Sequence, residues 1–498
     1  MAEPGVFDVH AYYPRALSHS IAPGYCLAQG RLAEALPVIG LAMFAAEPDD
    51  EAGCLAGADP VIAARHGRAV ERYADLLGRS RGLLMKASQL LSLANLPSAR
   101  SPEPIAIYRS LLARCGNDTP AMPGGLAADL AESELGLPLH QVFVDFDPHP
   151  LAAASIGQVH AATLQDGRDV AVKIQYPGVA EAIRTDLFDS DQLASFVRLG
   201  CEMTCVRPDI AAIAGELSAR IVEELDYQVE AANQEAFAAA YRGHPQIRIP
   251  ETVPELCTSR LLTMELSEGY SWERAKTAPK HLRDRWGEVI YRFAVGSLTR
   301  LGMLNADPSP RNYLFHADGG VTFLDFGCVR RYTARQVGTI QTLMRAIVDG
   351  DAEQLIDVLT QAGYVSQSNP PNPADLRAWF RAAHLPVVSE QPYTYSPEFA
   401  ATLRGPELAR SGRYADVIDG LNIPADYLAV VRVNLGITRV LSGLRATGDW
   451  AAMHREYCRA GYLPDCSPDS FDSWESHESW DSDSDSLDSR DFRGSLDL

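Results

Sequence analysis

The spacing of apolar residues changes twice along the chain and separates a β-rich segment from two helical ones. Between residues 60 and 96 leucines recur in pairs at positions 76/77, 83/84 and 90/91, which is typical of amphipathic helices. Residues 141–175 instead alternate or run apolar in short stretches around an Asp166-Gly167 turn, which predicts a hairpin of strands. From residue 281 to about 460 the pattern is again mainly helical.

The same helical and strand spacings of apolar residues predict several further elements. Strands are predicted at residues 141–147, 158–164, 169–175, 247–253 and 260–266. Helices are predicted at residues 126–135, 186–199 and 210–240. Predicted strands and helices therefore alternate between residues 126 and 266.

One stretch, residues 302–330, combines a hairpin signal with polar side chains. Asp307 lies in an Asp-Pro-Ser-Pro turn, Asn312 follows five residues later, and Asp325 begins an Asp-Phe-Gly triplet. Residues 312–315 and 321–325 are predicted strands joined by an Ala-Asp-Gly-Gly turn, which would bring Asp325 back beside Asn312. Magnesium bound with phosphates takes few protein oxygens, and a nearby carboxylate orients the acceptor. The stretch therefore predicts a phosphoryl-transfer site.

A second candidate is Lys173, in the Val-Ala-Val-Lys sequence of a predicted strand. Strand alternation would point this lysine away from the apolar face. A strand lysine paired with a carboxylate binds nucleotide phosphates in kinases. Small residues precede the neighbouring strand and would let backbone amides approach those phosphates; they are Ala152, Ala153, Ala154 and Ser155.

An acidic partner for Lys173 is expected on the helix that follows. Glu223, Asp226 and Glu230 are spaced to share one face of that helix, where unpaired like charges are unfavourable. Glu224 is adjacent to Glu223 and is the alternative partner if the helical phase differs. A nearby cation, such as Lys173, Lys86 or a metal ion, would relieve the repulsion.

Composition narrows the classes of function. The chain has 498 residues, 46% hydrophobic and 22% charged, which is ordinary for a soluble globular protein. A net charge of −21 argues against nucleic-acid binding and a polybasic membrane contact. Much of it lies after residue 464, where eleven acidic residues and two arginines predict a tail that does not fold alone.

Cysteines and apolar runs bear on the compartment. Nine scattered cysteines suit reduced thiols. No apolar run is long enough to span a bilayer, and no secretory signal begins the sequence. We expect an intracellular protein, cytoplasmic or peripheral to a membrane, with organelle import left open.

The candidate residues occur in the order of a known family. The chain resembles the UbiB (AarF) family of atypical, protein-kinase-like proteins over roughly residues 70–460. Lys86-Ala87-Ser88-Gln89 is similar to its KxGQ signature, and the alanines at 152–154 with Ser155 to its alanine-rich loop. The other matches are Lys173 with the ATP lysine, Glu224-Leu225-Asp226 with the ExD motif, Thr263-Met264-Glu265-Leu266 with the adenine hinge, Asp307 with the catalytic aspartate, and Asn312 and Asp325 with the metal ligands.

The resemblance implies an α+β, two-lobed protein-kinase-like fold with ATP and Mg²⁺ in the cleft. Its segments would be a lead-in (1–60), a helical extension over the cleft (61–118), a small lobe (119–266), a helical lobe (267–465) and an acidic tail (466–498). Lys86 and Gln89 are three residues apart, so both could point from one helical face into the site. Members are associated with ATP hydrolysis and isoprenoid-lipid metabolism. Nucleotide and an isoprenoid lipid or quinone precursor are therefore expected partners, and a protein substrate is not.

Several positions depart from the family pattern. Ser88 stands where the signature has glycine, and the HADPHPGN catalytic loop here begins with Asn305 and has Ser309 and Arg311 in place of its second histidine and its glycine. Arg311 is expected to require unusual backbone angles if that glycine did. Nucleotide binding is expected to survive, whereas turnover is an open question.

Two alternatives remain. An aminoglycoside- or choline-kinase-like phosphotransferase shares the Asp307, Asn312 and Asp325 arrangement, although the Lys-Ala-Ser-Gln and Glu-Leu-Asp-Tyr segments argue against it. A pseudokinase scaffold that acts through its helices and acidic tail is the other alternative.

Overall fold

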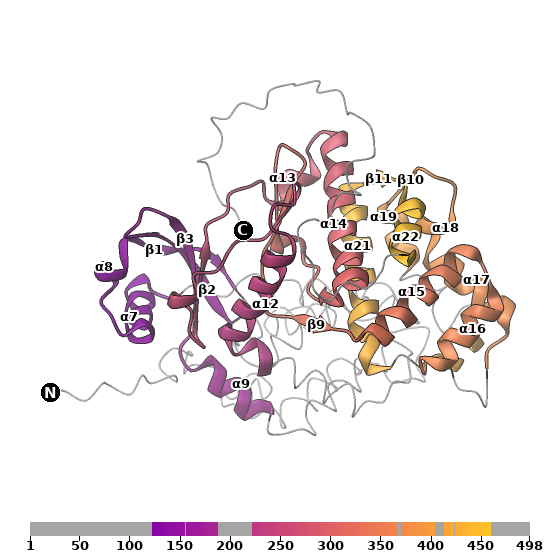
Figure 1. Cartoon of the computed structure of the whole chain (residues 1–498), viewed down its shortest axis with the longest axis horizontal. Helices are drawn as coiled ribbons and strands as arrows, with labels where there is room; N and C mark the ends of the chain where they lie inside the picture. Colours follow the sequence, from indigo (N-terminus) through magenta and orange to yellow (C-terminus); the bar gives the residue numbers. More distant parts are fainter. Residues whose placement is uncertain are drawn as a thin grey trace, which may run out of the picture.

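The computed structural model describes residues 122–154, 156–187, 222–365, 370–403, 413–422 and 424–459, which form two lobes (Figure 1). The smaller lobe is built on a four-stranded antiparallel sheet in the order β1-β2-β3-β5. Its strands are β1 (Phe143–Ala153), β2 (Gly157–Leu164), β3 (Asp169–Gln175) and β5 (Leu261–Glu265). The larger lobe is mainly helical, so the expected α+β, two-lobed arrangement is confirmed.

Short helices cover the smaller lobe. Helices α7 (Gly124–Leu135) and α8 (Leu139–Val142) pack on β1, and α9 (Val179–Leu187) follows β3. Ala127 and Ala131 of α7 are fully buried together with Val172 of β3. The burial of these apolar faces fixes the curvature and position of the sheet that carries Lys173.

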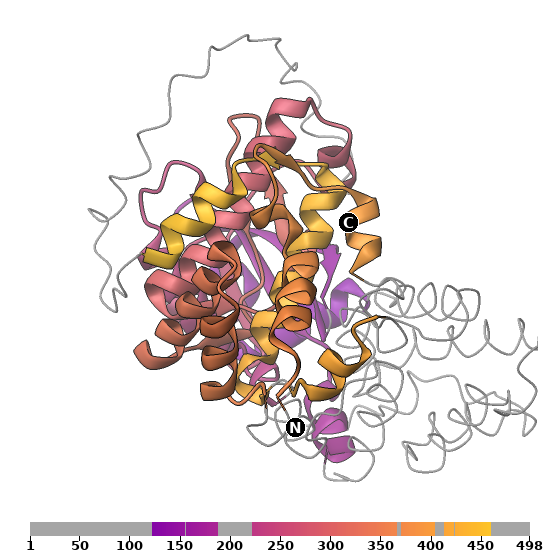
Figure 2. The ribbon, with the colours of Figure 1, turned by 90° about the vertical axis from the view of Figure 1, so that its right-hand side faces the viewer.

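The larger lobe is organised around the long helix α14 (Lys280–Leu301). Helices α15 (Ala334–Asp349), α21 (Leu428–Leu444) and α22 (Trp450–Arg459) pack on it, and Figure 2 shows this lobe in front of the sheet. The remaining helical elements are α13 (Trp272–Lys276), α16 (Ala352–Gln361), α17 (Pro373–Ala383), α18 (Leu385–Val388), α19 (Pro397–Thr402), α20 (Ala415–Gly420) and the 3₁₀ turns η1 (Pro254–Leu256), η2 (Pro310–Asn312) and η4 (Ala425–Tyr427).

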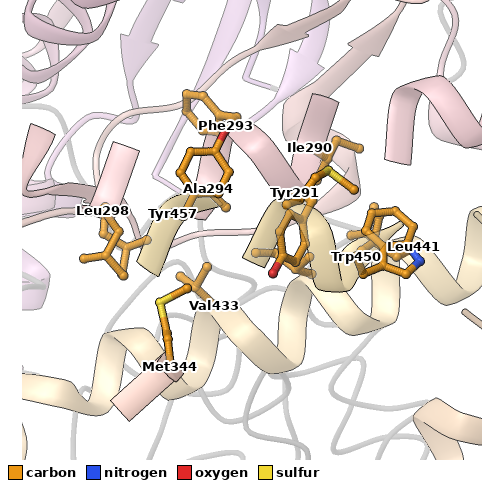
Figure 3. Packing of buried hydrophobic residues seen from close by; sticks show 14 of the residues in the cluster. Ile290, Tyr291, Phe293, Ala294, Leu298, Met344, Val433, Leu441, Trp450 and Tyr457 are labelled. Carbon is orange, nitrogen blue, oxygen red and sulfur yellow. The ribbon is translucent and has the colours of Figure 1, made fainter. Parts of the chain in front are cut away.

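Large aromatic and aliphatic side chains fill the space between these helices (Figure 3). Tyr291 and Phe293 of α14 lie in one cluster with Trp450 and Tyr457 of α22, and Trp450 and Tyr457 are fully buried. Burying a large apolar side chain is worth about 1.5–3 kcal/mol. The core therefore holds α14 firmly, and α14 is capped by Gly302, in the left-handed conformation at φ 61°, where the 302–330 stretch begins.

Short strands frame the 302–330 stretch. The predicted hairpin is confirmed as β7 (Tyr313–Phe315) and β8 (Val321–Phe323), and β4 (Ile247–Arg248) pairs in parallel with β8. Strand β6 (Met303–Asn305) pairs with β9 (Val329–Arg331), and β10 (Tyr393–Thr394) with β11 (Thr447–Gly448). Both ends of the 302–330 stretch are thus brought together by β6 and β9.

Helix α12 (Tyr227–Ala240) links the lobes. Tyr227 at its start belongs to the core of the smaller lobe, whereas Phe237 near its end belongs to the core of the larger one. We propose a lobe boundary near residue 266, with the end of α12 and β4 crossing it to pack on the helical lobe.

Some predicted elements differ from those observed. The helix at 126–135 and the strands at 158–164 and 169–175 are confirmed, but the strand at 247–253 is reduced to the two residues of β4. The predicted helix at 210–240 is wrong as one element, because it breaks at Leu225 and restarts at Tyr227. Of the predicted helix at 186–199, only the overlap with the end of α9 lies within the described residues.

Candidate active site

Lys173 lies in the middle of β3 and is almost completely buried, at 6% exposed. Its Nζ is 2.7 and 2.9 Å from the two carboxylate oxygens of Glu230 and 3.5 Å from Oδ2 of Asp325. Strand alternation predicted that the Lys173 side chain points away from the apolar face, but the structure shows it buried. Both neighbours, Val172 and Ile174, are buried too, because β3 is covered on both faces.

Glu230 is the acidic partner that the structure brings to Lys173. Its helix begins one turn earlier at Asp226, whose side chain accepts a hydrogen bond from the Gln228 amide as an N-cap. Glu223 and Glu224 precede this break. Asp226 is thus occupied at the helix start, and of the four candidate partners for Lys173 it is Glu230 that makes the ion pair. The separate roles expected for Glu224 and Asp226 remain predictions.

Burial dominates the electrostatics of this pair. The pKa of Glu230 is raised to about 7, because desolvation disfavours its charged form more than Lys173 favours it. For Lys173, burial lowers the pKa, but the charges of Asp325 and Glu230 outweigh it and raise the pKa well above its usual value. The lysine therefore stays protonated, as a phosphate-binding cation must.

Asp325 has an uncommon backbone conformation, with φ 61°. A left-handed non-glycine residue is strained, and such residues concentrate at functional sites. The Asp325 carboxylate accepts a hydrogen bond from the Gly327 amide at 3.1 Å, and its side chain is 35% exposed. One oxygen is thus fixed within the loop, while the other lies beside Lys173 and remains open to the cleft.

The Asp-Phe-Gly triplet is also attached to α12. Phe326 is fully buried with its ring 5.0 Å from that of Phe237, and Asn233 donates to the Phe326 carbonyl at 3.2 Å. A Cβ at Gly327 would lie 3.3 Å from Oδ1 of Asp325 and 3.4 Å from a Glu230 oxygen, so Gly327 lies against both carboxylates. The helix that supplies Glu230 therefore also positions Asp325.

Asp307 lies in the loop between β6 and η2. Its Oδ2 accepts a hydrogen bond from the Asn312 side-chain amide at 3.0 Å, and its Oδ1 lies 3.1 Å from a guanidinium nitrogen of Arg432 on α21. The Leu324 amide donates to the Asn312 carbonyl at 2.8 Å, so the hairpin does return the chain to Asn312, one residue before Asp325. Arg432 is a site residue that the sequence analysis missed.

The departures in the catalytic loop are accommodated. Asn305 accepts from the Asp307 amide at 3.1 Å and donates to the Asp325 carbonyl at 3.0 Å, so it ties the two aspartate loops together. Arg311 lies in η2, and the only described non-glycine residues with positive φ are Asp325 and Arg445. The expectation that Arg311 needs unusual backbone angles is therefore wrong.

In the alanine-rich segment at 152–154 and the expected hinge at 263–266, several backbone amides already donate hydrogen bonds within the protein. Ala154 donates to the Gly157 carbonyl at 2.8 Å, while Ala152 and Ala153 pair with β2. Glu265 donates to the Glu251 carbonyl and Leu266 to the Asp169 carbonyl, and Met264 is buried with its sulfur 3.4 Å from the Gln234 amide. The amides of Ala154, Glu265 and Leu266 therefore already have partners within the protein. Ser155, Lys86 and Gln89 lie outside the described residues.

The donors present fit magnesium carried in with a nucleotide. Asp325 and the Asn312 amide oxygen are hard ligands on adjoining loops, and Mg²⁺ usually takes one or two protein ligands with the rest from phosphates and water. In the described part of the chain no three His, Cys, Asp or Glu side chains gather as a metal cluster. The donor set thus suits a metal held jointly with phosphates.

The lysine–glutamate pair, the Asp-Phe-Gly loop and the Asp-x4-Asn loop define an atypical kinase-like protein. Residues 114–359 match the ABC1 atypical kinase-like domain, and the chain belongs to the UbiB family. It is 31% identical to the rat "Atypical kinase COQ8B, mitochondrial" over 57% of this chain and 53% of that protein. It is 30% identical to the Arabidopsis thaliana "Protein ACTIVITY OF BC1 COMPLEX KINASE 1, chloroplastic" over 64% of this chain and 46% of that protein.

These curated relatives are matched over about half of their own length. Among solved structures, a complex of Rv3197 with erythromycin from Mycobacterium tuberculosis is similar, with a TM-score of 0.56 and 26% identity. The match covers 80% of this chain and 97% of that one, so it extends well beyond the ABC1 domain. Within the described residues, no helix has the length and apolar character needed to cross a membrane.

Proposed function

We propose that the protein binds Mg-ATP between its lobes and hydrolyses it or transfers its terminal phosphoryl group to a small acceptor. One observation supports the proposal: Lys173, Asp307 and Asp325 come from three separate parts of the chain and are linked in one cluster of contacts through Glu230, Asn312 and Asn305. Phosphoryl transfer depends almost entirely on such positioning and on charge stabilisation. A surface hairpin with ordinary turn residues would not require a buried lysine beside it.

Each residue has a proposed task. Lys173, fixed by Glu230, would hold the α- and β-phosphates, and Asn312 with Asp325 would hold the metal. Bound magnesium would neutralise charge on the phosphate oxygens. Asp307, whose side chain is 27% exposed, would orient the acceptor hydroxyl or a water molecule.

The acceptor is proposed from the family. Three of its relatives carry names of atypical kinases in the COQ8 group, and we propose that this chain likewise supports isoprenoid-lipid metabolism of the ubiquinone type. The substrate would be an isoprenoid lipid or quinone precursor met at a membrane surface, and the KxGQ-like Lys86 and Gln89 would exclude a protein substrate.

The test uses purified full-length protein. Mg-ATP should raise the melting temperature of the wild type, and Asp325→Asn should abolish the shift because a metal ligand is lost. Asp357→Asn, an exposed residue on α16, removes the same charge outside the cleft and should keep the shift. Phosphate release should fall at least about 100-fold in Asp307→Asn while the shift persists.

Other outcomes discriminate between the functions. A shift without phosphate release, with or without quinone-precursor analogues and anionic liposomes, would favour the nucleotide-binding pseudokinase scaffold. One observation favours this second function: both oxygens of Asp307 already contact protein groups, Asn312 and Arg432. Absence of a shift in the wild type would refute nucleotide binding altogether.

A further inference from the structure

The carboxylate of Asp307 is held on both sides. Asn312, five residues along the same loop, donates to one oxygen at 3.0 Å. Arg432 contacts the other at 3.1 Å from a position 125 residues later in the chain. The two side chains of this ion pair are only 20% and 27% exposed. The contact is therefore shielded enough from solvent to hold a defined geometry.

The backbone of α21 touches the same loop. A Cβ at Gly436 would lie 2.2 Å from Cγ of Pro308, the residue after Asp307. Arg432 and Gly436 are four residues apart, so they lie on one face of the helix. The helix is thus seated on the catalytic loop by two contacts one turn apart. It lies beyond residues 114–359, the part matched by the ABC1 domain.

We propose that Arg432 is a positioning residue that fixes the Asp307 carboxylate for reaction, which rests on the proposed function of the site. A carboxylate has about four lone-pair positions, and Arg432 and Asn312 occupy two of them. The guanidinium removes rotational freedom about the Asp307 side chain and leaves the remaining lone pairs for the acceptor. Arg432 also contacts the sulfur of Cys328 at 3.9 Å, and its effect on the reaction is proposed to pass through Asp307.

The experiment compares phosphate release by Arg432→Gln, Arg432→Lys and the wild type in the full-length protein. Because a small misplacement of a reacting group can cost about 100-fold, kcat should fall about 10- to 100-fold in Arg432→Gln. KM for ATP should stay within about twofold, because Lys173 and Asp325 are untouched. Arg432→Lys should recover part of kcat. Arg439→Gln removes the same charge two turns along α21 from an exposed position and should keep kcat within about threefold.

A second background separates positioning from folding. In Asp307→Asn, single-turnover phosphate release should be changed less than about threefold by adding Arg432→Gln, since residues that act as a unit are non-additive. An equal loss in both backgrounds, or a KM that rises as kcat falls, would overturn the proposal and make Arg432 a purely structural residue. If the wild type is active and Arg432→Gln is equally active, the positioning role of Arg432 is refuted while the proposed function of the site stands. A wild type without turnover would refute this proposal and the proposed catalysis together.

Discussion

Replacing Glu230 with glutamine should destabilise the protein strongly, because it leaves the Lys173 ammonium buried without its closest counter-charge. The lysine side chain is 8% exposed and the glutamate side chain 4% exposed. Breaking a buried ion pair by removing one partner costs about 3–5 kcal/mol. Asp325 remains 3.5 Å from Nζ, and its partial exposure lets it compensate only in part. We therefore expect the lower end, about 3 kcal/mol.

The assay is urea unfolding followed by far-UV circular dichroism, with Lys173→Met completing a double-mutant cycle. The double variant should be more stable than the sum of the single losses predicts, by about 2–3 kcal/mol, because it leaves no buried charge from the pair. Glu235→Gln is the matched control, since Glu235 lies on α12 but is exposed. It should change the free energy of unfolding by less than about 0.5 kcal/mol.

Two results of this double-mutant cycle together would refute a buried Lys173–Glu230 ion pair. If Glu230→Gln cost less than about 1 kcal/mol and the coupling were close to zero, the pair would behave like an exposed surface salt bridge. Lys173 would then not be buried against Glu230, and the cleft would lack its fixed cation.

Two further predictions concern α12 and the buried histidines. Asp226→Ala should lower the free energy of unfolding by about 1 kcal/mol, because it removes the N-cap of α12. Asp226→Asn keeps a capping oxygen and should cost less than half of that. Equal losses for the two variants in urea unfolding would contradict a capping role. Burial lowers the pKa of His454 to about 3 and that of His244 to about 4, so between pH 6.5 and 4 the unfolded chain binds protons that the folded chain excludes. Stability should then fall as pH drops below 6.5, by up to about 1.4 kcal/mol per pH unit for each histidine. Thermal melts from pH 7.5 to 5 should show a shallower fall in His454→Gln; identical slopes would contradict this assignment.

Local signals predicted much of the site. The hairpin that joins Asn312 to Asp325 is encoded within fourteen residues by turn and strand residues, and the structure contains it. The partner of Lys173 depended instead on helical phase. Phase restarts wherever a cap breaks the helix, and Asp226 creates such a break between Glu224 and Glu230. Sequence spacing therefore included Glu230 among the candidate partners but could not select it from Glu223, Glu224 and Asp226.

Arg432 could not be found from spacing at all. Its contact with Asp307 joins residues 125 positions apart, and nothing in the sequence of α21 distinguishes Arg432 from Arg439 as the partner of a distant carboxylate. The burial of Lys173 was hidden for a related reason. Alternation predicts which face a strand residue occupies, but not that α12 covers the second face of β3. Both are consequences of tertiary packing, which a local pattern does not contain.

Helix α12 makes the parts of the site depend on one another. Its Glu230 side chain accepts hydrogen bonds from Lys173 in the smaller lobe, and its Asn233 side chain donates one to the Phe326 carbonyl at the edge of the larger lobe. These residues are three positions apart, so they share a helical face and cannot be adjusted separately. A rotation or one-turn shift of α12 would break both contacts at once and release Lys173 and Asp325 together.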